Sequence, residues 1–433
     1  MNAVAHQSAP QSLNADLTPP LSALQAMVES ARCLYCFEPA CVSACPTGID
    51  IPGFIRRIAD GNVAGAGRTI LSENILGGTC ARVCPTEILC QQACVRNTGE
   101  ERPVAIGRLQ RFATDALMGK GGHPFIRAAE SGKAVAIVGA GPAGLACAHR
   151  LSLLGHRVDI FEARPKPGGL SEYGLAAYKM ADDFAQRETS FILALGGIAV
   201  HYGRTLGETL DLDALSADYN AVFLAVGLGN PRPLGIAGDD LAGVEDALAF
   251  IEKIRQGVAA PILGRVIVIG GGNTAVDAAI QALCLGAGEV VMAYRRGAAQ
   301  MGATAWEQQL ALTRGVIIKP WLAPKRIVGE DGRVEAVQFE RTILADGVFL
   351  STGEVIEVPA DLVLTAIGQG LRADDLAGLA IDGGRIVVDN RYQTGRPGVF
   401  AGGDCIKSGL DLTVQAVEDG KRAAQAIDRF IRN

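Results

Sequence analysis

The sequence predicts an α/β protein with two Rossmann-like nucleotide-binding domains, preceded by an α-helical, cysteine-rich domain. A short apolar run followed directly by a glycine-rich turn and a helix begins at Ala134 and occurs again over Val266 to Ala278. This is the element order of a dinucleotide-binding unit. Eight of the eleven cysteines lie between Cys33 and Cys94, a region without strand-like alternation. A chain of 433 residues is long enough for each part to have its own core.

Composition and charge exclude several classes of protein. The net charge of -6 is small and both signs are mixed along the chain, so no basic face is offered to nucleic acid or to an acidic membrane surface. No basic and apolar leader opens the sequence, and its longest uncharged stretch, Ala134 to Ala148, is interrupted by glycines. We therefore expect a soluble, cytoplasmic protein.

The clustered cysteines indicate metal ligation rather than disulfides, because nothing in the sequence marks the chain for secretion. The first four have the spacing C-x2-C-x4-C-x3-C-P and the second four the spacing C-x3-C-P-x4-C-x3-C. Both are close to the bacterial ferredoxin pattern. This predicts two 4Fe-4S clusters, with a pair of structural zinc sites as the alternative, since thiolates suit both metals. The ligands would come from Cys33, Cys36, Cys41, Cys45, Cys80, Cys84, Cys90 and Cys94.

The first glycine-rich turn has the context of a dinucleotide site. It follows a strand and opens a helix, and Glu162 ends the next strand. The glycines permit a tight turn and close approach of the backbone to a pyrophosphate, which faces the helix N-terminus. Glu162 is expected to accept hydrogen bonds from the ribose hydroxyls. The turn residues are Gly139, Ala140, Gly141, Ala143 and Gly144.

Two later segments favour FAD over NAD at this first site. Gly168-Gly169-Leu170, after the acidic residue, is typical of two-dinucleotide flavoprotein reductases. In such proteins a late Gly-Gly-Asp, here ending in Asp404, supplies a carboxylate to the ribityl chain. The helix that begins near Thr413 would direct its positive end at the flavin. We therefore expect Gly169, Leu170, Asp404 and Thr413 to contact FAD.

The second glycine-rich turn predicts a nicotinamide dinucleotide site. Its residues are Gly270, Gly271, Gly272, Asn273 and Thr274. The acidic residue that would bind the ribose hydroxyls is missing at the end of the following strand, where Arg295 and Arg296 stand instead. Two guanidinium groups there suit a 2′-phosphate and so favour NADPH.

The order of these motifs predicts a domain arrangement. The segment from Ile386 to Asn433 is too short to stand alone, so we expect it to complete the first nucleotide domain, with the second inserted, by analogy with two-dinucleotide flavoproteins. The predicted boundaries are a flexible arm over 1–30, a helical domain with two 4Fe-4S clusters over 31–120, an FAD-binding domain over 132–255 and 372–433, and an NAD(P)H-binding domain over 256–371.

The cysteine region resembles the N-terminal domain of dihydropyrimidine dehydrogenase and, less closely, the small subunit of bacterial glutamate synthase. The resemblance is carried by Cys33-Leu-Tyr-Cys36, Cys45-Pro-Thr-Gly-Ile-Asp-Ile-Pro-Gly-Phe-Ile, Gly-Gly-Thr-Cys80 and Ile106-Gly-Arg-Leu-Gln-Arg-Phe-Ala-Thr-Asp115. It implies one cluster on Cys33, Cys36, Cys41 and Cys94, and a second on Cys45, Cys84, Cys90 and Gln110. Spacing alone would make Cys80 the eighth ligand instead.

The same resemblance implies roles in the two nucleotide sites. Lys179 aligns with a flavin-contacting basic residue of the pyrimidine enzyme, and Ala366, Ile367 and Gly368 look like the family's turn beside the nicotinamide. The two-subunit bacterial enzyme of this family is NADH-linked. A second basic residue of the NADPH-using relatives would fall near Gly302 and is absent here. The resemblance therefore favours NADH, although the two adjacent arginines suit NADPH.

The resemblance covers nearly all of the chain and implies an electron-input subunit. Such a subunit oxidises NAD(P)H at FAD and passes electrons through two 4Fe-4S clusters to an FMN and iron–sulfur partner subunit, in a heterotetramer that reduces uracil or thymine. Flavin N5 accepts the hydride, so no side chain need act as nucleophile or general base. The alternatives are a glutamate synthase small subunit or related NADPH-linked donor and, from a different class, an assembly scaffold with structural clusters.

Overall fold

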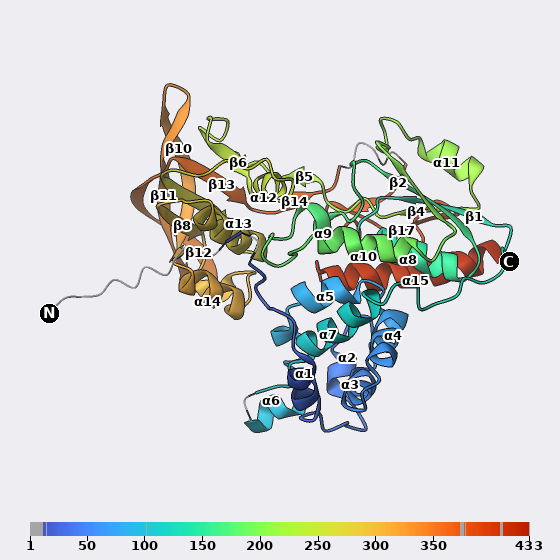
Figure 1. Ribbon diagram of the computed structural model, residues 1–433. Helices are drawn as coiled ribbons and strands as arrows, with labels where there is room; N and C mark the ends of the chain where they lie inside the picture. The colour runs from blue at the N-terminus through green and yellow to red at the C-terminus, as the bar shows by residue number, and fades with distance from the viewer. Residues whose placement is uncertain are drawn as a thin grey trace. The chain divides into compact units, whose positions relative to one another are not determined.

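The structure is a computed structural model, and it describes residues 12, 13, 15–100, 102–372, 376, 378–407 and 410–432 (Figure 1). The chain divides into two compact units. The major unit comprises Thr18–Glu172, Asp182–Asn230 and Gly370–Asn433. The inserted unit comprises Met1–Leu17, Tyr173–Ala181 and Pro231–Gln369. Among the described helices, none combines the length and the apolar character needed to cross a bilayer.

The N-terminal part of the major unit is helical and contains the eight clustered cysteines. Its elements are α1 (Ala23–Ser30), α2 (Ala40–Ser43), α3 (Ile51–Ala59), α4 (Val63–Glu73), α5 (Gly77–Val83), the 3-10 turn η1 (Thr86–Ile88), α6 (Val95–Glu100) and α7 (Ile106–Met118). Ser22 forms a capping box with Gln25 at the start of α1, and Asp50 caps α3. The apolar faces of α3 and α7 meet in a core that includes Phe54 and Leu109.

The rest of the major unit is built on a five-stranded parallel sheet. Its strands are β1 (Ala134–Val138), β2 (Arg157–Glu162), β3 (Ile198–Tyr202), β4 (Ala221–Leu224) and β17 (Val399–Ala401), in the order β17-β4-β1-β2-β3. The other elements are α8 (Pro142–Leu153), α9 (Leu170–Tyr173), α10 (Phe184–Leu193), α11 (Leu212–Asp218), β15 (Ile381–Asp382), β16 (Arg385–Ile386) and α15 (Thr413–Arg432). Val135 and Ile137 enter one core while Ala136 and Val138 enter another, so both faces of the sheet are covered.

The C-terminal segment completes this sheet. β17 pairs with β4 in parallel, and α15 lies along α8 (Figure 1). A Cβ added at Gly420 of α15 would lie 2.1 Å from the Ala143 carbonyl oxygen of α8. The two helices therefore pack at a distance that requires glycine at this position.

The inserted unit contains a second five-stranded parallel sheet and a three-stranded antiparallel sheet. The parallel order is β6-β13-β7-β8-β9 and the antiparallel order is β10-β11-β12. The elements are β6 (Val244–Asp246), α12 (Ala247–Arg255), β7 (Arg265–Gly270), α13 (Asn273–Cys284), β8 (Glu289–Tyr294), the 3-10 turn η2 (Ala298–Gln300), α14 (Ala305–Thr313), β9 (Ile317–Pro320), β10 (Leu322–Glu330), β11 (Arg333–Ala345), β12 (Val348–Pro359) and β13 (Leu362–Ala366). The short strands β5 (Asn230–Pro231) and β14 (Gln369–Gly370) lie where the chain passes between units. Two Rossmann-like sheets after a helical cysteine region confirm the predicted fold class.

The structure places two boundaries differently from the predicted ones. Residues 231–255 belong to the inserted unit, because β6 pairs with β13 and α12 packs into the same core, whereas the predicted NAD(P)H-binding domain began at 256. The predicted flexible arm contains defined structure within its described part, since Leu17 N–H donates to Tyr178 O over 2.8 Å and α1 begins at Ala23. Residues 1–11 and 14 of the arm lie outside the described residues.

Candidate functional site

The cysteines of the helical part are free thiols that form two groups. In the first, burial, together with the neighbouring thiols of Cys33 and Cys94, raises the pKa of Cys41 to about 11. Burial also raises the pKa of Cys33, which has Cys36 and Cys94 as neighbours. These four cysteines line one small pocket together. The structure thus brings together the set that the resemblance assigns to the first cluster.

The second group contains the other four cysteines. Burial, and to a smaller extent the neighbouring thiols of Cys45 and Cys41, raises the pKa of Cys90 to about 12. The pKa of Cys84 is raised most by its hydrogen bond with Cys80, then by burial and by the charges of Cys80, Cys90 and Cys45. Cys80 therefore lies in contact with Cys84, as spacing alone predicts for a ligand of this group.

The donor set of both groups fits an iron–sulfur cofactor. The raised pKa values of Cys33, Cys41, Cys84 and Cys90 disfavour their thiolates, and a bound cationic metal core would remove that penalty because ligated thiolates are stabilised by the metal. Soft sulfur donors in this number are the ligands that iron–sulfur clusters take. Within the described ranges, no group of three or more His, Cys, Asp or Glu side chains is arranged to hold a single metal ion.

Gln110 is buried on α7 and points toward the helix that carries Cys80. Its exposed fraction is 8%, so it is not the surface residue that a lone helical glutamine usually is. Its Nε2 donates to Gly77 O, at the start of α5, over 2.7 Å. Because the amide is planar, this bond directs Oε1 away from Gly77. Gln110 therefore lies against the start of the helix that carries Cys80, and both residues remain candidates for the fourth ligand of the second group.

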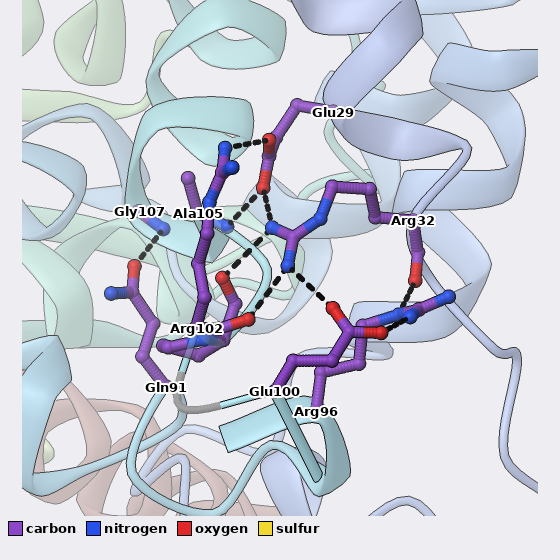
Figure 2. A network of polar contacts seen from close by, with 9 residues as sticks. Glu29, Arg32, Gln91, Arg96, Glu100, Arg102, Ala105 and Gly107 are labelled. Carbon is purple, nitrogen blue, oxygen red and sulfur yellow. Dashed lines mark hydrogen bonds and ion pairs between the residues drawn. The ribbon is translucent and has the colours of Figure 1, made fainter.

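A polar network holds the chain segments next to Cys33 and Cys94 (Figure 2). Arg32, which precedes Cys33, donates to two carboxylates and two backbone carbonyls, and its own carbonyl accepts a hydrogen bond. The partners are Glu29, Glu100, Arg102 O, Pro103 O and the side chain of Arg96. The network fixes the loop before Cys33 against the segment after Cys94, two positions that are far apart in sequence.

Glu188 of α10 joins the cysteine-bearing helices to the first nucleotide sheet. This buried carboxylate accepts from Gly78 N–H over 2.8 Å and from Thr79 N–H over 3.0 Å, at the start of α5, and also from the Thr79 hydroxyl. Burial raises the pKa of Glu188 to about 7, and its hydrogen bonds with Thr79 oppose that rise. Sequence reasoning missed this residue. The sequence does contain a signal for its burial, because Glu188 lies four positions from both Phe184 and Ile192 and so on the same apolar face of the helix.

The turn after β1 has the geometry of a dinucleotide-binding turn. Gly139 has a φ of 102°, which favours glycine. A Cβ at Gly144 would lie 2.0 Å from the Gly139 carbonyl oxygen, so the start of α8 also requires glycine. Glu162, at the end of β2, accepts from Ala140 N–H over 2.7 Å and thus faces the turn. The structure brings the predicted glycines and the predicted acid together.

The Gly168-Gly169 loop lies against this turn. A Cβ at Gly169 would lie 2.7 Å from Gly141 Cα, and Gly168 N–H donates to Ala140 O over 2.8 Å. Leu170 begins α9, and Ala143 lies in the first turn of α8. The two loops and the N-terminus of α8 therefore converge where a pyrophosphate would bind.

Asp404 lies at the carboxyl end of β17, on the loop that leads to α15. Burial, followed by the charge of Asp411, raises its pKa to about 6, and Arg385 opposes the rise. Thr413 is the first residue of α15. A carboxylate and a helix N-terminus thus follow a strand of the sheet, and ligands of open α/β sheets bind at the carboxyl ends of the strands. These residues fit the ribityl and flavin contacts predicted for FAD.

FAD binding to the apoprotein is expected to strengthen as the pH rises through about 6. Asp404 is protonated below its raised pKa of about 6, and only the ionised carboxylate accepts charge-assisted hydrogen bonds from the ribityl hydroxyls. Fluorescence titrations of flavin at a series of pH values measure this. Asp404→Asn is the control and should bind FAD more weakly, with little change across the same pH range. An Asn variant with the wild-type pH dependence would contradict the assignment.

A pocket of about 670 Å³ lies at the carboxyl end of the second parallel sheet. That volume is typical of a small-molecule site. Gly271 closes over the ring of Tyr294, where a Cβ would lie 2.5 Å away. Asn273 is not in the lining, and its Oδ1 is buried without a hydrogen-bond partner among the described residues. The predicted residues that line the pocket are Gly270, Gly271, Gly272, Thr274, Arg295, Ala366, Ile367 and Gly368.

The structure separates the two consecutive arginines. Arg295 lines the pocket. Arg296 lies over the ring of Phe349 on β12, with its guanidinium carbon 5.0 Å from the ring centre. The prediction that two guanidinium groups meet the dinucleotide therefore differs from the observed arrangement, in which one of them lines the pocket and the other stacks on the antiparallel sheet.

Lys179 is buried in the inserted unit between two carboxylates. Its Nζ lies 2.8 Å from Asp277 Oδ1 on α13 and 2.5 Å from Glu307 Oε1 on α14. Burial lowers the pKa of Lys179, but the two carboxylates outweigh that effect and raise it. Lys179 is thus not a solvated surface charge. Its contact with the flavin stays a prediction from the resemblance.

Comparison with protein families gives two matches along the chain. Residues 133–420 match the pyridine nucleotide-disulphide oxidoreductase family. Residues 12–121 match a family described as dihydropyrimidine dehydrogenase domain II, 4Fe-4S cluster. The helical cysteine part and the two nucleotide-binding sheets each fall within a described family.

Curated relatives match over nearly the whole chain. The NAD-dependent dihydropyrimidine dehydrogenase subunit PreT of Escherichia coli K12 is 36% identical and covers 96% of this chain and 97% of its own. The PreT homolog of Salmonella typhi is 35% identical with the same coverage. The glutamate synthase [NADPH] small chain of Escherichia coli K12 is 34% identical over 95% of this chain and 93% of its own. All three are named as subunits or chains of larger enzymes.

Solved structures share the fold of the nucleotide-binding part. FprA of Mycobacterium tuberculosis, determined in complex with NADPH, is 23% identical with a TM-score of 0.59, over 70% of this chain and 85% of its own. Lactococcus lactis thioredoxin reductase is also 23% identical, with a TM-score of 0.56, over 69% of this chain and 99% of its own. The two-Rossmann arrangement is therefore shared with flavoprotein reductases.

Proposed function

The chain belongs to the pyridine nucleotide-disulphide oxidoreductase family, and we propose that it is the electron-input subunit of an NAD-dependent dihydropyrimidine dehydrogenase. It is an NAD(P)H-dependent flavin oxidoreductase with a 4Fe-4S domain. In this proposal it oxidises NADH at FAD and delivers electrons through two 4Fe-4S clusters to an FMN-containing partner subunit. The partner reduces uracil or thymine to the 5,6-dihydro form.

One observation carries the proposal. The cysteine-rich helices and the first nucleotide sheet form one compact unit rather than two separate domains. Glu188 caps α5 from the sheet side, and Lys421 of α15 donates to Thr47 O, close to Cys45, over 2.9 Å. Such contacts would hold an FAD and the iron–sulfur groups of the two parts at a fixed separation, which electron transfer between them needs. An assembly scaffold would not need this.

The side chains of the chain bind and orient rather than react. FAD supplies hydride acceptance and single-electron transfer when bound. Gly139, Gly141 and Gly144 allow the backbone to approach the pyrophosphate, and Glu162 and Asp404 accept from the sugar hydroxyls. The pocket beside Gly270 would hold the nicotinamide dinucleotide.

The purified chain is expected to bind FAD and about eight irons, and to reduce a dye with NADH. It is not expected to reduce uracil without a partner, because the proposal assigns that reaction to the FMN-containing partner subunit. Flavin and iron analysis, dye reduction and an assay for dihydrouracil measure these points. Turnover of uracil by the isolated chain would refute the proposal that a partner subunit reduces the pyrimidine. Clusters that stay unbleached in the presence of NADH and dye would favour an assembly scaffold.

A glutamate synthase small chain or a related NADPH-linked donor is the second candidate. Arg295 in the pocket lining favours it, because a guanidinium suits a 2′-phosphate. The first candidate predicts a higher kcat/KM with NADH than with NADPH, since a single guanidinium can also meet the pyrophosphate or stack on adenine. Steady-state dye reduction with each cofactor measures the ratio. A preference for NADPH that Arg295→Ala abolishes would support the second candidate against the first.

A further inference from the structure

We propose that Phe349 keeps Arg296 out of the dinucleotide pocket and thereby determines the preference for NADH over NADPH. The inference rests on the proposed nicotinamide dinucleotide site and names the residue that sets its specificity. Arg296 is adjacent in sequence to the pocket residue Arg295, and its side chain is the nearest additional cation in sequence that a 2′-phosphate could recruit. Because the Arg296 guanidinium stacks on the Phe349 ring, it would have to leave that ring before it could bind a 2′-phosphate.

Hydrogen bonds from β11 and from Trp321, which lies between β9 and β10, fix the backbone of both arginines. The Thr342 hydroxyl of β11 donates to Arg295 O over 2.7 Å. Trp321 N–H donates to Arg296 O over 3.0 Å. Of the two side chains, only that of Arg295 belongs to the pocket lining, whereas that of Arg296 lies over the Phe349 ring. The antiparallel sheet thus helps to position a pocket residue, Arg295, although the glycine-rich turn of the pocket belongs to the parallel sheet.

Trp321, whose backbone N–H donates to Arg296 O, is held in place by close packing beside the Phe349 ring. The rings of Trp321 and Phe349 lie 6.3 Å apart in a tilted arrangement. Trp321 has a φ of 64°, a conformation uncommon for a large residue and retained where the surroundings enforce it. A Cβ at Gly297 would lie 2.6 Å from the Trp321 ring. Phe349 is itself 40% exposed, so its ring offers Arg296 a stacking partner at the surface, next to the fixed ring of Trp321.

The chemistry discriminates between the two dinucleotides. A 2′-phosphate carries negative charge and is bound best by a guanidinium that can donate two hydrogen bonds. A ribose diol gains nothing comparable from a further cation beside Arg232 and Arg295, which already line the pocket. Loss of the Phe349 ring should release Arg296 and strengthen binding of the phosphorylated nucleotide only. A cation–π contact at a partly exposed site is modest, so the expected gain is about two- to fivefold.

The experiment compares Phe349→Ala, Arg296→Ala and the double variant in the full chain. Calorimetry measures the affinity for 2′,5′-ADP and 5′-AMP, and dye reduction gives kcat/KM for NADPH and NADH. Phe349→Ala should raise the 2′,5′-ADP affinity about two- to fivefold and leave that for 5′-AMP unchanged. The double variant should lose the gain. Phe349→Leu should behave as the alanine variant, since it keeps apolar bulk without a π face, and Phe349→Trp should behave as the wild type.

Two results would overturn the inference. One is an unchanged preference in both Phe349→Ala and Phe349→Leu, and the other is a gain that persists when Arg296 is also removed. A wild-type chain that binds neither 5′-AMP nor NADH would instead contradict the proposed function. The experiment thereby distinguishes an error in the role of Phe349 from an error in the proposed nucleotide site.

Discussion

Replacing Gly144 with alanine is expected to weaken FAD binding by about tenfold or more. The added Cβ would lie 2.0 Å from the Gly139 carbonyl oxygen and 3.4 Å from the Ala225 Cβ. Backbone atoms cannot rotate away as a flexible side chain does, so the turn and the start of α8 would have to separate. That separation removes the close approach of the backbone to the pyrophosphate. Flavin content after purification and fluorescence titration with FAD measure the effect.

The matched control for this variant is Gly395→Ala. Gly395 is an exposed glycine in the same unit, and an added Cβ there meets nothing within 4 Å. It should bind FAD as the wild type does. Circular dichroism and thermal unfolding of each variant separate a local loss of FAD from a loss of the fold. Near-normal FAD affinity in a folded Gly144→Ala variant would contradict the assignment of this turn.

The nucleotide turns were predictable because their signal is local. The strand, the glycine turn, the helix and the acid of the first site lie within Ala134 to Glu162, and the structure brings Glu162 against the turn. The same holds for the second turn at Gly270, which lines the pocket. Where a few neighbouring residues dictate the geometry, spacing alone identifies it.

Features that depend on tertiary contacts were not predictable from spacing. Cys94 closes the second run of four, yet the structure places it with Cys33 and Cys41, and only the resemblance indicated that exchange. Gly78 and Glu188 are 110 positions apart in sequence, so no local pattern reveals their hydrogen bond. The position of Arg296 depends on Phe349, which comes from a different sheet. Such pairings follow from chain topology, which a motif does not encode.

The domain boundary at the inserted unit illustrates a different difficulty. The stretch before the second glycine turn contains the short β6 and the amphipathic α12, and nothing in its composition shows which sheet these elements join. β6 becomes the edge strand beside β13, whose residues come more than a hundred positions later. The parallel pairing across the insertion, rather than a linker signal, sets the boundary near Pro231.

The eighth ligand of the iron–sulfur groups is expected to be Gln110 rather than Cys80. A neutral amide oxygen donates less electron density than a thiolate and leaves the cluster one negative charge poorer, so the two ligands predict different potentials. The assignment rests on the resemblance, and the hydrogen bond to Gly77 O engages the amide nitrogen of Gln110 rather than the amide oxygen that would bind iron. Cys80 is also buried beside Cys84, which makes it the direct competitor.

Three variants decide between these two residues, with iron content and redox titration as the measurements. Gln110→Ala should lose about four irons or make one cluster sensitive to oxygen, whereas Cys80→Ala should keep the full iron content. Gln110→Cys should keep a four-iron cluster whose potential falls, since a thiolate stabilises the oxidised state. Because Cys80 is packed, unfolding of Cys80→Ala is checked with Cys80→Ser. If both Cys80 variants lose about four irons while Gln110→Ala retains all of them, the eight-cysteine arrangement holds and the glutamine assignment is wrong.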